Sequence, residues 1–185
     1  MKPFNVKQRA LQVSTFASVV LLTACAGMEA SGPRADATLE PRSGSSVSGT
    51  VSFREVGGKV RVEARVAGLT PGEHGFHIHE SGDCSAPDAM SAKGHFNPAG
   101  KSHGHHGGND RHAGDMPNLV ADSGGKAVLT ADLDMLSLNE GPAGILKRSV
   151  VIHADPDDYK SQPAGNSGKR VACGTIRMIG ASGGY

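Results

Sequence analysis

A strictly alternating segment, Lys59–Ala67, most constrains what this chain can fold into. Val60, Val62, Ala64 and Val66 take every second position, and the residues between them are charged. Successive side chains of a β-strand point to opposite faces, so this pattern predicts a strand with one buried and one solvated face. Strands of this kind are typical of antiparallel sheets.

The other apolar runs are also short and are separated by turn residues. Gly57-Gly58 joins the alternating segment to residues 47–56, which predicts a hairpin. Glycine accounts for 26 of the 185 residues, and this abundance weakens helices. We therefore expect an all-β fold, a Greek-key β-sandwich or flattened barrel of about eight antiparallel strands with two long functional loops at 82–117 and 154–169. The remaining strands are expected at residues 75–80, 118–122, 126–134, 149–153 and 170–179.

The N-terminus has the features of an export signal. Three basic residues precede a mostly apolar stretch at residues 10–24, which is shorter than the roughly 20 residues of a transmembrane helix. Leu22-Thr23-Ala24-Cys25 resembles the site at which bacterial lipoproteins are cleaved and acylated on the cysteine. We predict a signal peptide at residues 1–24 and a lipid on Cys25. An ordinary signal peptide with an incidental cysteine is the alternative.

The segment after the signal is rich in Gly, Ser, Pro and Ala and shows no regular period. We expect lipidated Cys25 and a flexible tether at residues 25–46, a domain at 47–180 and a flexible tail at 181–185. An ordered arm packed on the domain is the alternative to the tether. An acidic residue directly after the lipidated cysteine would favour retention in the inner membrane, but Ala26 stands at this position. We therefore expect an exported, periplasmic or cell-envelope lipoprotein that is anchored in the outer membrane.

The charge balance limits the partners of the chain. Its formal net charge is +1 at pH 7, so no strongly basic field is present to attract nucleic acid. The membrane is expected to be contacted through the N-terminal lipid alone. The sequence leaves a monomer and a homodimer equally open.

Histidines carry the clearest indication of function, because five of the nine lie between residues 95 and 112. In the strand expected around Phe76-His77-Ile78-His79, alternation places His77 and His79 on one face. His153 ends another expected strand and His95 begins the first long loop, so these four imidazoles can converge on one ion. Four nitrogen donors suit Cu(II).

The loop that begins at His95 offers a second set of ligands. Together with His103, His112 and Asp115, His95 supplies three nitrogens and one carboxylate, which suits a tetrahedral zinc ion. A bound metal would order a loop that has little apolar content. The alternative is a solvated, histidine-rich segment that binds metal loosely.

Five motifs of the chain resemble those of the copper/zinc superoxide dismutase family in its bacterial secreted form. In chain order they are GFHIHESGDC, GHFNPAGKSH, RHAGDMPN, VVIHADPDD and GNSGKRVACG. They follow the family's order and nearly its spacing over residues 47–179. The resemblance implies an oxidoreductase that converts superoxide, its substrate, to dioxygen and hydrogen peroxide outside the cytoplasm, with copper and zinc as cofactors.

The resemblance also implies roles for single residues. It makes His95 a bridge between the two metals, and it makes Asp157 a carboxylate that hydrogen-bonds one ligand of each metal, here His77 and His103. Arg170 matches the arginine that attracts and orients superoxide. A plain surface acid and a solvated surface charge are the alternatives for Asp157 and Arg170. The implied copper ligands are His77, His79, His95 and His153, and the implied zinc ligands are His95, His103, His112 and Asp115.

Cys84 and Cys173 match the intrasubunit disulfide of the family, and two free buried thiols are the alternative. His105 and His106 are additional to the family pattern. The spacing from His95 to His103 and on to His112 agrees with the family, so we expect His103 to be the ligand and the two additional histidines to be exposed or to bind auxiliary metal. His74 has no assigned partner and is expected to be structural or solvent-facing.

Two other functions remain open from the sequence. A protein of the same fold could bind or deliver copper without turnover, but a carrier would need neither the zinc ligands nor Arg170. A structural or adhesive surface lipoprotein would leave the ligand-like spacing of the histidines unexplained.

Overall fold

The computed structural model of the chain describes residues 32–180 together with Met1. Apart from Met1, the predicted signal peptide at 1–24 lies outside the described residues, as do Cys25, the first part of the predicted tether and the tail at 181–185. Among the described residues, no helix is long and apolar enough to span a membrane.

The regular structure of residues 32–180 is almost entirely antiparallel β-sheet, which confirms the predicted all-β fold. The one helical element described is a 3-10 turn, η1 (Met90–Ala92). The strands are β1 (Arg34–Pro41), β2 (Ser48–Val56), β3 (Lys59–Ala67), β4 (Gly72–His74), β5 (Phe76–His79), β6 (Leu119–Ala121), β7 (Ala127–Leu133), β8 (Ser149–His153), β9 (Arg170–Thr175) and β10 (Arg177–Ile179).

The strands form one strongly curved ten-stranded sheet. Along the sheet the order is β4-β6-β7-β3-β2-β1-β9-β8-β5, and β10 pairs with β1 off this path. The two strands at the ends of this order, β4 and β5, are separated in the chain by Gly75 alone. The sheet must therefore curve until its edges meet, which gives a nearly closed barrel. Two neighbouring pairs, β3 with β7 and β1 with β9, are far apart in sequence.

The predicted hairpin around the alternating segment is present. β2 and β3 pair in antiparallel register from Ser48↔Ala67 to Val56↔Lys59. Gly57 and Gly58 form the turn with φ of 59° and 78°, which glycine adopts without steric cost. The apolar face of β3 is buried in a continuous core with apolar residues of the other strands, among them Val51, Phe53, Phe76, Ile78, Leu119, Val150, Ile152 and Ile176.

β1 corrects the predicted tether. Residues 25–46 were expected to be flexible, but Arg34–Pro41 is a strand that pairs with β2, β9 and β10. Ala35, Ala37 and Leu39 are at most 2% exposed and belong to the core. The ordered-arm alternative therefore holds for this part of the segment. The folded domain therefore begins before residue 47, because β1 pairs with three strands and contributes to the core.

Two further details differ from the predicted strands. The segment expected at 75–80 contains β5 and is preceded by a short strand, β4, that the sequence did not predict. The segment expected at 170–179 is divided at Ile176 between β9 and β10. β4 pairs with β6 whereas β5 pairs with β8, and β9 pairs with β1 and β8 whereas β10 pairs with β1 alone.

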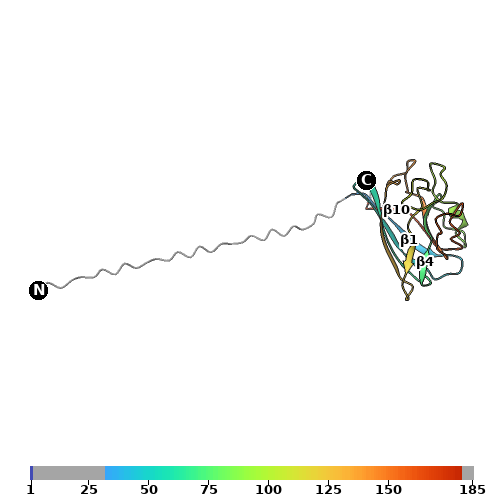
Figure 1. The fold of residues 1–185 in the computed structure, drawn as a ribbon, viewed down its shortest axis with the longest axis horizontal. Helices are drawn as coiled ribbons and strands as arrows, with labels where there is room; N and C mark the ends of the chain where they lie inside the picture. Colours follow the sequence, from blue (N-terminus) through green and yellow to red (C-terminus); the bar gives the residue numbers. More distant parts are fainter. Residues whose placement is uncertain (2–31, 181–185) are drawn as a thin grey trace. The chain divides into compact units, whose positions relative to one another are not determined.

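The two predicted long loops are present and carry most of the site described below. One connects β5 to β6 and the other connects β8 to β9. In Figure 1 the long connections of the domain gather on one side of the barrel. The barrel wall thus provides a rigid support from which the loops present polar side chains.

Candidate metal centre

Two groups of buried side chains meet beside β5, and His95 belongs to both. Within each group, one ligand atom from every residue lies within 4.8 Å of those of the others. The first group is His77, His79, His95 and His153, and the second is His95, His103, His112 and Asp115. The structure therefore brings together both sets of ligands that the sequence predicted.

The backbone of β5 places these residues. His77 and His79 share one face of the strand, while Phe76 and Ile78 point into the core from the other face and are fully buried. The amide of Ile78 donates to the carbonyl of Gly114 at 2.9 Å, and its carbonyl accepts from the amide of Phe96 at 2.8 Å. Both bonds hold the long loop against β5, which sets His95 beside His79 and Asp115 beside His77.

In the first group, the nitrogens that face inward have no hydrogen-bond partner. They are His77 Nδ1, His79 Nε2, His95 Nε2 and His153 Nε2, and all are buried. A buried polar atom left unpaired costs about 1–3 kcal/mol, so four together indicate that a ligand satisfies them. Four convergent imidazole nitrogens fit copper.

The outer ring nitrogens of the same histidines are occupied. His79 Nδ1 donates to the carbonyl of Lys93 at 2.9 Å, and His153 Nδ1 lies 3.3 Å from the carbonyl of Gly168. His77 Nε2 donates to Asp157 Oδ2 at 2.8 Å. These bonds fix the tautomers, so that a lone pair points inward from each ring.

The second group has the dimensions of a tetrahedral site. Asp115 Oδ1 lies 2.9 Å from His95 Nδ1, 3.1 Å from His103 Nδ1 and 3.4 Å from His112 Nδ1. A tetrahedron with metal–ligand bonds of about 2 Å has ligand atoms about 3.3 Å apart, so these residues fit zinc. Asp115 Oδ2 accepts from the amides of Gly104 and His112, which keeps Oδ1 directed at the imidazoles.

Asp157 joins the two groups. Its Oδ2 accepts from His77 Nε2 at 2.8 Å, and its Oδ1 accepts from His103 Nε2 at 2.9 Å. The residue is 3% exposed, so the alternative of a plain surface acid is wrong. Gly165 passes so close that a Cβ there would lie 1.8 Å from Asp157 Oδ1, and its φ is +64°. Only glycine leaves room for the carboxylate at this point.

Two amide side chains that the sequence analysis did not single out hold the main chain of this network. Asn118 accepts from the amide of Asp157 and donates to its carbonyl, both at 3.0 Å. Gln162 likewise accepts from the amide of His103 at 2.8 Å and donates to the carbonyl of His103 at 2.9 Å. Each long loop thus fixes a residue of the other. Asn118 lies within a quoted motif, whereas no sequence signal pointed to Gln162.

Burial and nearby charges shift the pKa values of the histidines in opposite directions, downward in the first group and upward at His103 of the second. Burial, together with the neighbouring imidazoles, holds the pKa of His79 and of His153 well below the ordinary value, and lowers the pKa of His95 to about 3. Burial also disfavours the charged form of His103, but the carboxylates of Asp115 and Asp157 outweigh it and raise its pKa to about 9. The first group therefore offers neutral imidazoles, the form that binds metal.

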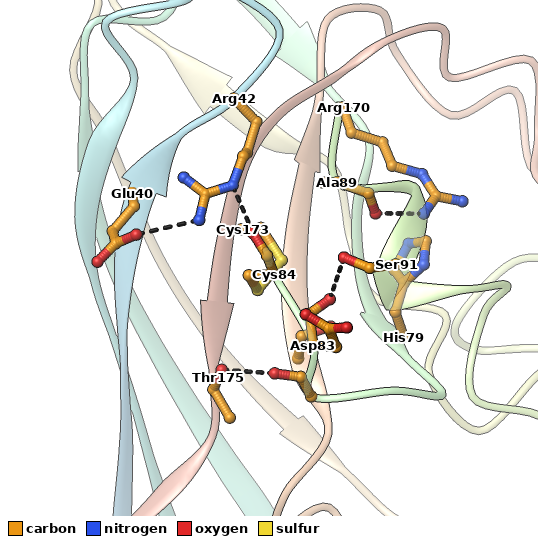
Figure 2. Close-up of a disulfide and its surroundings, with 12 residues drawn as sticks. Glu40, Arg42, His79, Asp83, Cys84, Ala89, Ser91, Arg170, Cys173 and Thr175 are labelled. Carbon is orange, nitrogen blue, oxygen red and sulfur yellow. Dashed lines mark hydrogen bonds and ion pairs between the residues drawn. A yellow bond between two sulfur atoms is a disulfide. The ribbon is translucent and has the colours of Figure 1, made fainter. Parts of the chain in front are cut away.

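A cleft of about 290 Å³ leads to the first group. Its lining includes His79, His95, His153 and Arg170, together with Pro163 and Ala164. Arg170 Nη1 donates to the carbonyl of Ala89 at 2.8 Å, and the guanidinium lies beside the ring of His79 (Figure 2). A small anion entering the cleft therefore meets a fixed positive charge next to the inward-facing nitrogens.

The predicted disulfide is confirmed. Cys84 and Cys173 are bonded at an S–S distance of 2.00 Å across a sequence separation of 89 residues. In the chain-entropy model, closing a loop of this length stabilises the fold by about 4–5 kcal/mol. The bond also ties the loop after β5 to β9, three residues after Arg170.

The remaining histidines lie outside both groups. His105 is exposed and His106 is partly buried, with ring centroids 4.0 Å apart. His74 is buried and its Nδ1 donates to the carbonyl of His153 at 2.9 Å, so it is structural and does not face solvent. The spacing argument that chose His103 over His106 therefore agrees with the geometry.

The fold and the site together define a class of protein, an antiparallel β-barrel with two adjoining histidine-rich metal sites. A family model described as copper/zinc superoxide dismutase (SODC) matches residues 47–176. The chain belongs to this family. It is accordingly a superoxide dismutase that uses copper and zinc.

Individual relatives agree with this assignment. The chain is 44% identical over 170 residues to "Superoxide dismutase [Cu-Zn]" of Deinococcus radiodurans, covering 85% of this chain and 91% of that protein. It is 45% identical over 136 residues to "Superoxide dismutase [Cu-Zn] 2" of Aquifex aeolicus, covering 71% and 80%. A crystal structure of the clock protein EA4 matches with a TM-score of 0.72 at 42% identity, covering 79% of this chain and 94% of that one.

Proposed function

We propose that the chain dismutates superoxide outside the cytoplasm at a copper site bridged to a structural zinc by His95. The observation that carries this proposal is the double membership of His95. Its Nε2 faces the first group without a partner, while its Nδ1 lies 2.9 Å from Asp115 Oδ1 in the second. A single imidazole that presents both nitrogens to two ligand sets is suited to bridging two metals.

The remaining ligands follow from the two groups. His77 Nδ1, His79 Nε2 and His153 Nε2 would hold copper with His95, and His103, His112 and Asp115 would hold zinc with His95. When bound, copper supplies one-electron redox chemistry, and zinc, which has no second accessible oxidation state, supplies a fixed charge.

His95 has the task of moving a proton. The overall reaction takes two superoxide anions and two protons to dioxygen and hydrogen peroxide. His95 Nε2 takes up one proton in one half of the cycle and gives it to the second superoxide in the other, and water supplies the second proton. Asp115 and the loop around it keep the ring in place while Nε2 changes its protonation state.

Arg170 would attract and orient the substrate. Its guanidinium lines the cleft, and burial lowers its pKa from the ordinary value, which leaves it charged because that value is far above neutrality. Partial burial strengthens its attraction for an anion, since less water screens the charge.

The proposed location rests on the sequence of the N-terminus. A basic start, an apolar stretch and Leu22-Thr23-Ala24-Cys25 support export and lipidation at Cys25, and Ala26 favours the outer membrane. The disulfide between Cys84 and Cys173 is in keeping with an oxidising compartment.

Metal content and superoxide decay, measured together on purified protein loaded with copper and zinc, test the proposed function. The expected result is one copper and one zinc per chain with catalytic decay of superoxide over many turnovers. One bound copper per chain with only stoichiometric consumption of superoxide would instead indicate a copper-binding protein without turnover.

A further inference from the structure

We propose that Arg42 is a positioning residue for Arg170 and acts through the disulfide loop, defined here as residues 82–92. This inference rests on the proposed role of Arg170 in binding superoxide. Arg42 lies just after β1, in the segment that the sequence predicted to be a tether and before the residues that the family model matches.

The guanidinium of Arg42 is fixed by three acceptors, two of which Figure 2 shows. Its Nε donates to the carbonyl of Cys84 at 2.8 Å, and its Nη2 donates to Glu40 Oε2 at 3.0 Å. The third bond runs from Nη1 to the carbonyl of Pro41 at 2.7 Å. Its side chain is only 15% exposed. An arginine held at three points gives the disulfide loop a rigid support.

The backbone around Arg42 also holds both segments that determine where Arg170 lies. The amide of Arg42 donates to the carbonyl of Val171 at 2.9 Å, and Ser43 Oγ donates to the carbonyl of Arg170 at 2.8 Å. The amide of Ser43 donates to the carbonyl of Pro87 at 2.7 Å, within the disulfide loop. The start of β9 and the disulfide loop are thus bound by the same two residues.

The guanidinium of Arg170 depends on this arrangement, because its partner is the disulfide loop. Arg170 Nη1 donates to the carbonyl of Ala89 at 2.8 Å. Movement of the loop would move this acceptor and leave the guanidinium free to turn away from the copper ligands. Arg42 holds the loop at Cys84, and the disulfide to Cys173 holds the same residue from the other side.

The expected effect of Arg42 is positional and is not a matter of net charge. Glu40 pairs with its guanidinium, so its field at the cleft is largely cancelled. Arg34 provides a matched control, because it lies at the other end of β1 and, like Arg42, pairs with an acidic residue two positions away, Asp36 at 3.3 Å. Replacing Arg34 removes the same charge without touching the disulfide loop.

The experiment compares full-length Arg42→Met, Arg42→Lys, Arg34→Met and Arg170→Ala, each loaded with copper and zinc. Methionine keeps the apolar stem of Arg42 and removes every donor. Lysine keeps the charge but offers a single nitrogen in place of the planar, forked guanidinium. The readouts are metal content, the rate of superoxide decay, the Kd of azide as a small anionic probe, and hydrogen exchange of the disulfide loop in the metal-free protein.

Arg42→Met is expected to weaken azide binding and slow superoxide decay by about three- to ten-fold at full metal content, which is the scale of one ordinary net hydrogen bond. Amide exchange at Ala89 and Ala92 should become faster. Arg42→Lys should recover part of the azide affinity, and Arg34→Met should match the unmodified protein in every readout.

Wild-type azide affinity in Arg42→Met, beside a clear loss in Arg170→Ala, would overturn the inference and leave the proposed function intact. Unchanged affinity in Arg170→Ala would instead remove Arg170 from the site. An equal loss in Arg34→Met would assign the effect to net charge and overturn the inference. If Arg42→Met does not fold, wild-type azide affinity in Arg42→Lys overturns it, and an intermediate affinity at full metal content supports it.

Discussion

His77 and His103 donate to the two oxygens of a single carboxylate, that of Asp157, at 2.8 and 2.9 Å. His77 belongs to the group that fits copper, and His103 belongs to the group that fits zinc. The orientation of one ligand in each group is therefore set by the same buried side chain, in addition to the link that His95 provides.

Asp157→Asn should weaken the binding of metal at both groups. An amide presents one oxygen and one NH2, so either His77 or His103 then faces a donor and its ring loses the bond that fixes its tautomer. We expect a loss of about 10- to 100-fold in affinity, measured by competition with a chelator for each metal in turn. Asp155→Asn, a change at an exposed neighbour, should leave both affinities as they are. Unchanged affinities in Asp157→Asn would exclude the carboxylate from ligand orientation.

Gly165→Ala tests the same network through sterics. The added Cβ would lie 1.8 Å from Asp157 Oδ1 and 2.8 Å from His103 Nε2, so the carboxylate must move. Gly100 has a similar φ of +60° but open space around it, so Gly100→Ala carries only the backbone strain, roughly 1–2 kcal/mol. We expect Gly165→Ala to lose zinc affinity by at least about ten-fold and Gly100→Ala to lose stability alone. Equal zinc affinity in both variants would contradict this account.

Most of the barrel could be predicted because its strands alternate visibly. Val60, Val62 and Val66 are large enough to mark a buried face, and paired glycines mark the turn before them. β1 was missed because Ala35 and Ala37 are small and the flanking sequence is rich in glycine and serine. Their burial follows from the pairing of β1 with β2 and β10, a tertiary property that local sequence does not carry.

The metal ligands could be predicted because the chemistry of two ions requires a few residue types at particular spacings. The residues that hold those ligands in place could not be predicted from the sequence. Gln162 meets the main chain of His103, and Arg42 meets the carbonyl of Cys84, through contacts between segments far apart in the chain. Such contacts depend on the register of distant elements, and any polar residue in a loop could have made them.

Arg170→Ala should lower the rate of superoxide decay strongly while both metals stay bound. Arg170 is not a member of either ligand group, so coordination should not change. The rate should also depend less on ionic strength, because the positive charge that salt screens is gone. Stopped-flow decay between low and high salt measures both effects. The same rate as the unmodified protein at low salt would show that Arg170 does not guide the substrate.

Cys25→Ser should release the protein from membranes and leave its activity intact. Without the thiol no lipid can be attached, whereas the barrel and its ligands are unaffected. Fractionation of cells followed by activity measurement in the soluble and membrane fractions provides the test. Persistence of a cleaved Cys25→Ser protein in the membrane fraction would contradict the lipid anchor.

The claim that His95 bridges two metals is central, and its replacement has two consequences that can be separated. Removing the imidazole takes one ligand from each group, so three remain for copper and three for zinc. The proton carrier would also be lost, and a large fall in activity is expected even if both metals bind. His106→Ala serves as the control, because His106 belongs to neither group and its loss should change nothing.

The most direct test is therefore the affinity of His95→Ala for copper and for zinc, each measured with the other metal absent. The account predicts that both affinities fall, together with an altered copper spectrum. A weaker affinity for copper beside an unchanged affinity for zinc would show that His95 serves one metal only, and the bridge would be wrong.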